Sequence, residues 1–120
     1  MVWTGPQGGS DPAVYSTGED TLFILGGGSG KSTDGGFSFV AVPKPSGSWR
    51  QPDVIAVPGG YRMYYSAPEG GIRSAFSADG TEWIEDPGRR LDMGLDPTVV
   101  RMPDGTYRMY YRLAVAPPEA

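Results

Sequence analysis

The pentapeptide YRMYY occurs twice in the chain, at residues 61–65 and at 107–111. Each copy is the last part of a longer segment, which begins near a proline and continues with an apolar run and a turn. A third segment near the N-terminus aligns with these two, and the three read RQPDVIAVPGGYRMYY (50–65), LDPTVVRMPDGTYRMYY (95–111) and SDPAVYSTGEDTLFIL (10–25). Their prolines stand 40 and 45 residues apart, which indicates an internal repeat.

The second unit of this repeat reads as four short strands, at residues 53–57, 61–66, 71–77 and 81–85. The turn words PGG, PEG and ADG separate them, and such residues suit hairpin links. Four strands in a repeat of 40–45 residues are typical of a β-propeller blade. We therefore predict an all-β protein of four-stranded antiparallel blades. The alternative is an ordinary β-sandwich whose segments resemble one another by chance.

The stretch LFILGGGSGKSTDGG (22–36) looks like a nucleotide-binding P-loop, but its context favours a strand. A P-loop needs a glycine five positions before the Gly30-Lys31-Ser32 word, and that position is Leu25. It must also open a helix, whereas β-forming residues follow here. The words STDG (32–35) and SADG (77–80) align, so the glycine-rich loop takes the place of a third strand and its hairpin turn.

Composition narrows the functional classes. The aromatic content (Trp 3, Tyr 7, Phe 4) argues against disorder despite many Gly and Pro residues. The net charge of -4 gives no electrostatic basis for binding nucleic acid. The chain has no Cys and no His, so the commonest zinc ligands and the commonest catalytic base are missing. We find no signal peptide and no apolar run of membrane-spanning length, and localisation stays open.

The repeat divides the chain into two whole blades and a remainder. We expect an orphan outer strand in 1–10, blades in 11–50 and 51–95, and a half blade with a tail in 96–120. Such an array would expose sheet edges and apolar blade faces. If the N-terminal strand of one copy completes the half blade of another, a homodimer closes a six-bladed ring, within the usual range of four to eight. The competing interpretation is a fragment of a longer propeller.

The repeat also resembles a known group of enzymes. The pattern DPxVVxxxDGxYRMYY, followed by SxDGxxW, resembles the blades of five-bladed propeller glycoside hydrolases of the arabinanase and invertase type. The SxDG turn is similar to the Asp-box of sialidase-type propellers, one residue shorter. The resemblance implies a site at the channel mouth, where the acid of an Asp-Pro pair acts as base or nucleophile. Asp11 and Asp96 match that catalytic position, and no glutamate matches a general acid, which a two-carboxylate glycosidase requires.

Four further residues are candidates for substrate binding at this mouth. Gln51 replaces the acid in the second unit, and Asp53 lies just beyond its proline. Arg62 and Arg108 recur on the second strand, where stacking on tyrosine or pairing with an inner-strand acid is the plainer role. The aspartates before proline have a structural interpretation too, as turn starters. We expect Asp34 and Asp79 to be structural.

Three functional hypotheses follow. The first is a carbohydrate-active hydrolase or sugar-binding relative. The second is a metal-assisted hydrolase of phosphate or sulfate esters, in which paired copies of Asp11 and Asp96 would hold Ca²⁺, Mg²⁺ or Mn²⁺. The third is a designed or trimmed propeller fragment without evolved activity. We expect the three tryptophans (Trp3, Trp49 and Trp83) to cover the blade cores, with sugar stacking as the lesser option.

Overall fold

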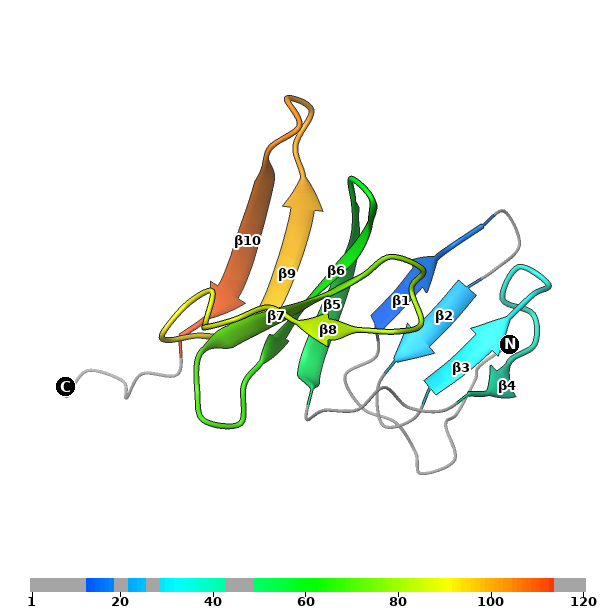
Figure 1. Ribbon diagram of the computed structural model, residues 1–120, viewed down its shortest axis with the longest axis horizontal. Coiled ribbons are helices and arrows are strands. Elements are labelled where there is room, and N and C mark those ends of the chain that lie inside the picture. The colour runs from blue at the N-terminus through cyan, green and yellow to red at the C-terminus, as the bar shows by residue number, and fades with distance from the viewer. Residues whose placement is uncertain (1–12, 19–21, 26–28, 43–48, 114–120) are drawn as a thin grey trace, which may run out of the picture.

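The computed structural model describes residues 13–18, 22–25, 29–42 and 49–113, with the backbone alone for 22–25 and 29. The described residues form ten β-strands and no helix, arranged in three antiparallel sheets (Figure 1). The prediction of an all-β, antiparallel protein is therefore confirmed. Within these same residues no helix is present that could cross a membrane.

The central sheet contains the four strands β5 (Arg50–Val57), β6 (Gly60–Ser66), β7 (Ile72–Ser77) and β8 (Ile84–Glu85). They pair in chain order, each antiparallel to the next, as the turn words between them predict. The outer strand β8 is shorter than the 81–85 expected from sequence. The amides of Thr81 and Glu82 both donate to Asp79 Oδ1, at 2.8 and 3.0 Å. These residues therefore belong to the turn, and β8 begins only at Ile84.

The first sheet has the same order and contains β1 (Ala13–Ser16), β2 (Leu22–Leu25), β3 (Ser29–Ser32) and β4 (Val40–Ala41). The glycine-rich loop that looks like a P-loop supplies β3 and its hairpin turn, and no helix follows Lys31. The prediction of a strand at this position is confirmed. The third sheet is the hairpin of β9 (Leu95–Arg101) and β10 (Tyr107–Arg112), the two strands expected after residue 95.

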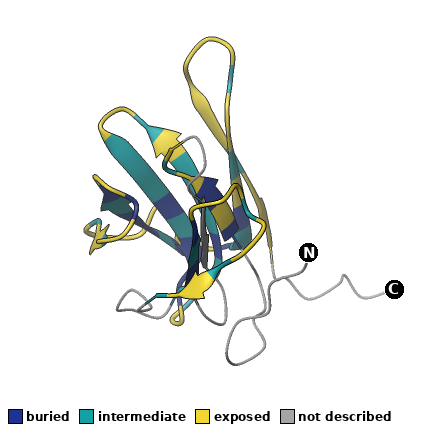
Figure 2. Cartoon of the chain, turned by 90° about the vertical axis from the view of Figure 1, so that its right-hand side faces the viewer, coloured by how far each residue is buried: buried dark blue, intermediate teal, exposed yellow. Residues whose placement is uncertain are grey.

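The three sheets meet through their first strands. Strand β5 contacts β1 on one side and β9 on the other, so the central sheet lies between its neighbours (Figure 1). The third sheet is largely exposed, whereas the central sheet consists mostly of intermediate and buried residues (Figure 2). Two parts of the chain have therefore very different surroundings although they carry the same YRMYY word.

The main hydrophobic core lies between the first and central sheets. Tyr15 reaches across from β1 to pack with Met63, Tyr65 and Ala75, all four at most 7% exposed. Its hydroxyl donates to the carbonyl of Gly80 at 2.6 Å, which ties β1 to the turn between β7 and β8. Four partly buried residues pack around this cluster: Trp49, Val54, Tyr61 and Trp83.

Two of the tryptophans therefore cover a core, as the sequence predicts. The rings of Trp49 and Tyr65 lie 5.8 Å apart, and Trp83 meets Tyr15 edge to face at 6.0 Å. Trp3 lies outside the described residues, as does the orphan strand expected in 1–10.

Candidate ligand site at the strand starts

The residue before the repeat proline has an unusual backbone in both units where it is described. Gln51 and Asp96 each have φ of +52°, and they alone among described non-glycine residues have positive φ. Both lie where the sheet register shifts, at a bulge between Arg50 and Asp53 and at the matching end of β9. A left-handed non-glycine residue costs about 1–3 kcal/mol, and such residues cluster at functional sites. Both were selected from sequence, Asp96 as an Asp-Pro position and Gln51 as the residue that replaces the acid in the second unit.

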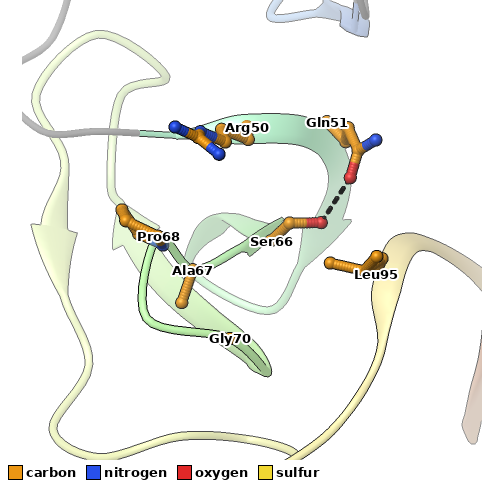
Figure 3. Close-up of a pocket in the computed structure, with 7 residues that line it drawn as sticks. All are labelled: Arg50, Gln51, Ser66, Ala67, Pro68, Gly70 and Leu95. Carbon is orange, nitrogen blue, oxygen red and sulfur yellow. Dashed lines mark hydrogen bonds between the residues drawn. The ribbon is translucent and has the colours of Figure 1, made fainter. Parts of the chain in front are cut away.

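A single serine connects the two strained positions. Ser66, at the end of β6, donates its hydroxyl proton to Gln51 Oε1 at 2.6 Å (Figure 3). The same hydroxyl oxygen accepts the backbone amide of Asp96 at 3.0 Å. The serine is 2% exposed, and both bonds are partly shielded from solvent. The starts of β5 and β9 are thereby held side by side.

In the third unit an arginine stands where the second has this serine. Arg112 follows the second YRMYY word as Ser66 follows the first, and its Nε donates to Asp96 Oδ2 at 3.0 Å. Both members of this ion pair are partly exposed. One repeat position therefore supports an amide–hydroxyl pair in one unit and a carboxylate–guanidinium pair in the next.

An open pocket of about 470 Å³ adjoins Gln51 and Ser66. Figure 3 shows Arg50 and Gln51 along one side of it, with Leu95 approaching from the third sheet. The remaining lining residues belong to the end of β6 and the following turn, and they are Ser66, Ala67, Pro68 and Gly70. The pocket thus offers a guanidinium, an amide and a hydroxyl beside short apolar groups.

Asp53 joins two sheets through a hydrogen bond. Its Oδ2 accepts the backbone amide of Val99 in β9 at 2.7 Å. Burial raises the pKa of Asp53, and the bond from Val99 opposes this rise. Its described contact is structural, because it supplies a carboxylate acceptor to a backbone donor of the neighbouring sheet.

The two arginines proposed for substrate binding have different surroundings. Arg62 Nε lies 3.2 Å from Asp86 Oδ2, and its guanidinium carbon sits 5.3 Å from the centre of the Phe76 ring. The expected partners were a tyrosine or an inner-strand acid, whereas the observed acid follows the outermost strand and the ring belongs to β7. Arg108 is exposed on β10 and forms no ion pair within the part of the chain that the structure describes.

Of the two proposed catalytic residues, Asp11 and Asp96, the structure describes only Asp96. Asp96 lies at the start of β9, whereas Asp11 lies outside the described residues. Across the described segments, no three Asp, Glu, His or Cys side chains gather as a metal-binding group.

Asp34 and Asp79 form similar turn networks. Ser32 and Ser77, both about 1% exposed, donate to Oδ1 of the aspartate two residues later. Bonds from Ser38 and then Ser32 lower the pKa of Asp34 to about 2. The backbone amides of Glu82 and Thr81 hold the pKa of Asp79 well below its usual range. These contacts support the structural role expected for both aspartates.

Sequence reasoning missed Arg50, Ser66 and Arg112. A signal was present, because the residue after YRMYY changes from Ser66 to Arg112 while the residue before proline changes from Gln51 to Asp96. In the structure each of these two pairs is in contact.

No protein-family model matches this chain, and no curated protein sequence matches it. The functional interpretation therefore depends on the geometry at the strand starts.

Proposed function

We propose that the chain is a section of a β-propeller and that the starts of β5 and β9 form a carbohydrate-binding mouth. The arrangement of sheets supports the propeller. Each four-stranded sheet runs in chain order from its first strand, and the first strands lie next to each other. Propeller blades have this order, and their first strands line a shared channel.

The observation that carries the ligand site is the matched strain at Gln51 and Asp96. Two units hold the same position in a left-handed backbone, each with a polar partner at the end of the next strand. Strained residues persist where surrounding structure holds them, and they often serve binding. Gln51 lines the pocket, and Asp96 directly follows the lining residue Leu95.

The chemistry of this region suits sugar hydroxyl groups. Each hydroxyl both donates and accepts, so it can bond to the Gln51 amide, the Arg50 guanidinium or the Asp96 carboxylate. Small-molecule sites combine apolar walls with a few placed polar groups, as this pocket does. Hydrolysis would need a second carboxylate opposite Asp96. Binding needs only groups that are described, so binding is the function proposed.

A glycan array followed by calorimetry tests the proposal. We expect the wild-type chain to bind a carbohydrate, and Arg50→Ala and Asp96→Asn each to weaken binding about tenfold or more. The reason is that a hydrogen bond to a charged group contributes about 1.5–3 kcal/mol. Asparagine tolerates positive φ, so the second substitution changes charge and keeps the backbone. Melting curves would verify that each variant folds.

Arg101→Ala is the matched control, because Arg101 is exposed on β9 and does not line the pocket. Its affinity should equal that of the wild type. The proposal fails if the folded wild-type chain binds no glycan, or if Arg50→Ala and Arg101→Ala behave alike. Incubating the ligand with wild type and Asp96→Asn would also reveal hydrolysis, seen as products from the wild type alone.

A further inference from the structure

We propose that the outer face of the β9–β10 sheet binds the outer face of the β1–β4 sheet in a second copy of the chain. The two faces carry the repeat positions that pack against each other inside one chain. This inference concerns assembly and is independent of any ligand at the mouth.

The strand registers show which residues are equivalent. Val14 pairs with Ile24, Val54 with Met63, and Val99 with Met109. These three pairs occupy the same place in their sheets. The next residue of each first strand points to the opposite face, because side chains alternate along a strand. Tyr15 and Val100 are therefore also equivalent.

The internal interface shows how two such sheets pack. Tyr15, on one face of the first sheet, is 7% exposed because the central sheet covers it with Met63 and Tyr65. Val54 lies on that same covering face and packs against the cluster. Within the chain, the residue at the Tyr15 position of one sheet therefore packs near the residue at the Val54 position of the following sheet.

At the two ends of the row the same positions are open. Val100, the equivalent of Tyr15, is 44% exposed, and Tyr110 beside it on that face is 60% exposed. Val14, the equivalent of Val54, is 55% exposed. One end therefore presents half of the internal interface, and the other end presents the complementary half.

A second copy satisfies both ends. The central sheet separates the first and third sheets within one chain (Figure 1), so the two open faces do not meet there. Contact between unlike faces is heterologous, and it closes when the rotation per chain divides the circle. Two chains with three sheets each would make six, within the usual range for propellers. Burial of Val14, Val100 and Tyr110 supplies the driving force, and Arg108, paired with Val100 on the same face, lies at this contact.

Cysteine cross-linking tests the pairing of faces, because the chain has no cysteine of its own. Val14→Cys and Val100→Cys would be prepared as separate chains, mixed, and treated with a short bis-maleimide. We expect a covalent dimer from the mixture and none from either chain alone. A mixture of Ala78→Cys with Val100→Cys is the control and should give no dimer, since Ala78 is exposed in a turn of the central sheet.

Cross-linking of Val100→Cys chains with one another would overturn the proposal, because it would show that like faces meet. Light scattering adds a second measurement. The wild type should have a mass of at least twice 12.8 kDa. Tyr110→Glu should shift the assembly toward single chains, with a dissociation constant at least tenfold higher.

Phe37→Glu is the matched control for this substitution, because Phe37 is 72% exposed in the loop between β3 and β4. It should leave the mass unchanged. A folded wild-type chain with the mass of one copy at all concentrations, and no cross-link in the mixture, would overturn the inference. Circular dichroism would show that each variant keeps its strands.

Discussion

At the residue scale, two positions have the same backbone conformation but side chains of different chemistry. Gln51 and Asp96 are both left-handed, and their partners Ser66 and Arg112 differ to match. The serine is the more constrained of the two partners, since it is buried and bonds to both strained positions. Its removal would leave an amide oxygen and a backbone donor without this partner.

We expect Ser66→Ala to lower the free energy of unfolding by about 1–3 kcal/mol, because buried groups left without partners carry that penalty. Urea unfolding followed by tyrosine and tryptophan fluorescence would measure it. Ser16→Ala is the control, since Ser16 is exposed and bonds only locally to Gly18. It should change the free energy by less than about 0.5 kcal/mol. If both substitutions changed the free energy of unfolding equally, the hydrogen bonds of Ser66 would not stabilise the fold more than an exposed local bond does.

At the scale of elements, the SxDG turns decide where strands end. In the central sheet the Asp79 carboxylate takes the amides of Thr81 and Glu82, so those amides are unavailable to a sheet ladder. In the first sheet Asp34 instead binds Ser38 through its amide at 2.9 Å. Because Asp79 binds the amides of Thr81 and Glu82, β8 begins at Ile84 and is shorter than the sequence suggests.

These turns predict a loss of stability in acid. The pKa values of Asp34 and Asp79 are lower in the folded chain than in the unfolded chain, where about 3.9 is usual. Their contribution is therefore complete well above pH 4 and is lost as pH falls toward about 2. Urea midpoints measured at pH 6, 4 and 2.5 should fall along that series. The double variant Asp34→Asn/Asp79→Asn should show a shallower fall, and an unchanged slope would contradict the assignment.

At the scale of the whole molecule, burial differs sharply between equivalent residues. Met63 is fully buried between the first and central sheets, whereas Met109 at the same repeat position is only partly buried. The difference follows from position in the row of sheets, because the two residues stand in the same sequence word. The buried apolar contacts that stabilise the fold are therefore concentrated between the first and central sheets.

We expect Met63→Ala to destabilise the fold by about 2–5 kcal/mol, since it removes buried volume from a packed core. Met109→Ala should cost clearly less. The comparison would be made by thermal unfolding of dilute protein, so that any contact between copies is minimal. An equal loss of stability in the two variants would contradict the placement of the main core between the first and central sheets.

Local patterns in the chain were sufficient to place most strands. The turn words between β5 and β8 and the two YRMYY copies identify the strands within a few residues, because hairpins depend on neighbouring residues. The same reasoning rejected the P-loop and placed β3 correctly. It also selected Gln51 and Asp96, because their place before a repeated proline is visible in the letters.

Tertiary contacts decided the rest. Arg62 meets Phe76 and Asp86 because the pairing of β6 with β7, and of β7 with β8, brings them together within the central sheet. Asp53 bonds to Val99 because one sheet packs on another. Ser66 reaches two strand starts that are 15 and 30 residues away in sequence. Strand pattern depends on local backbone preference, whereas such partners depend on which faces meet, and that is set by burial across the whole molecule.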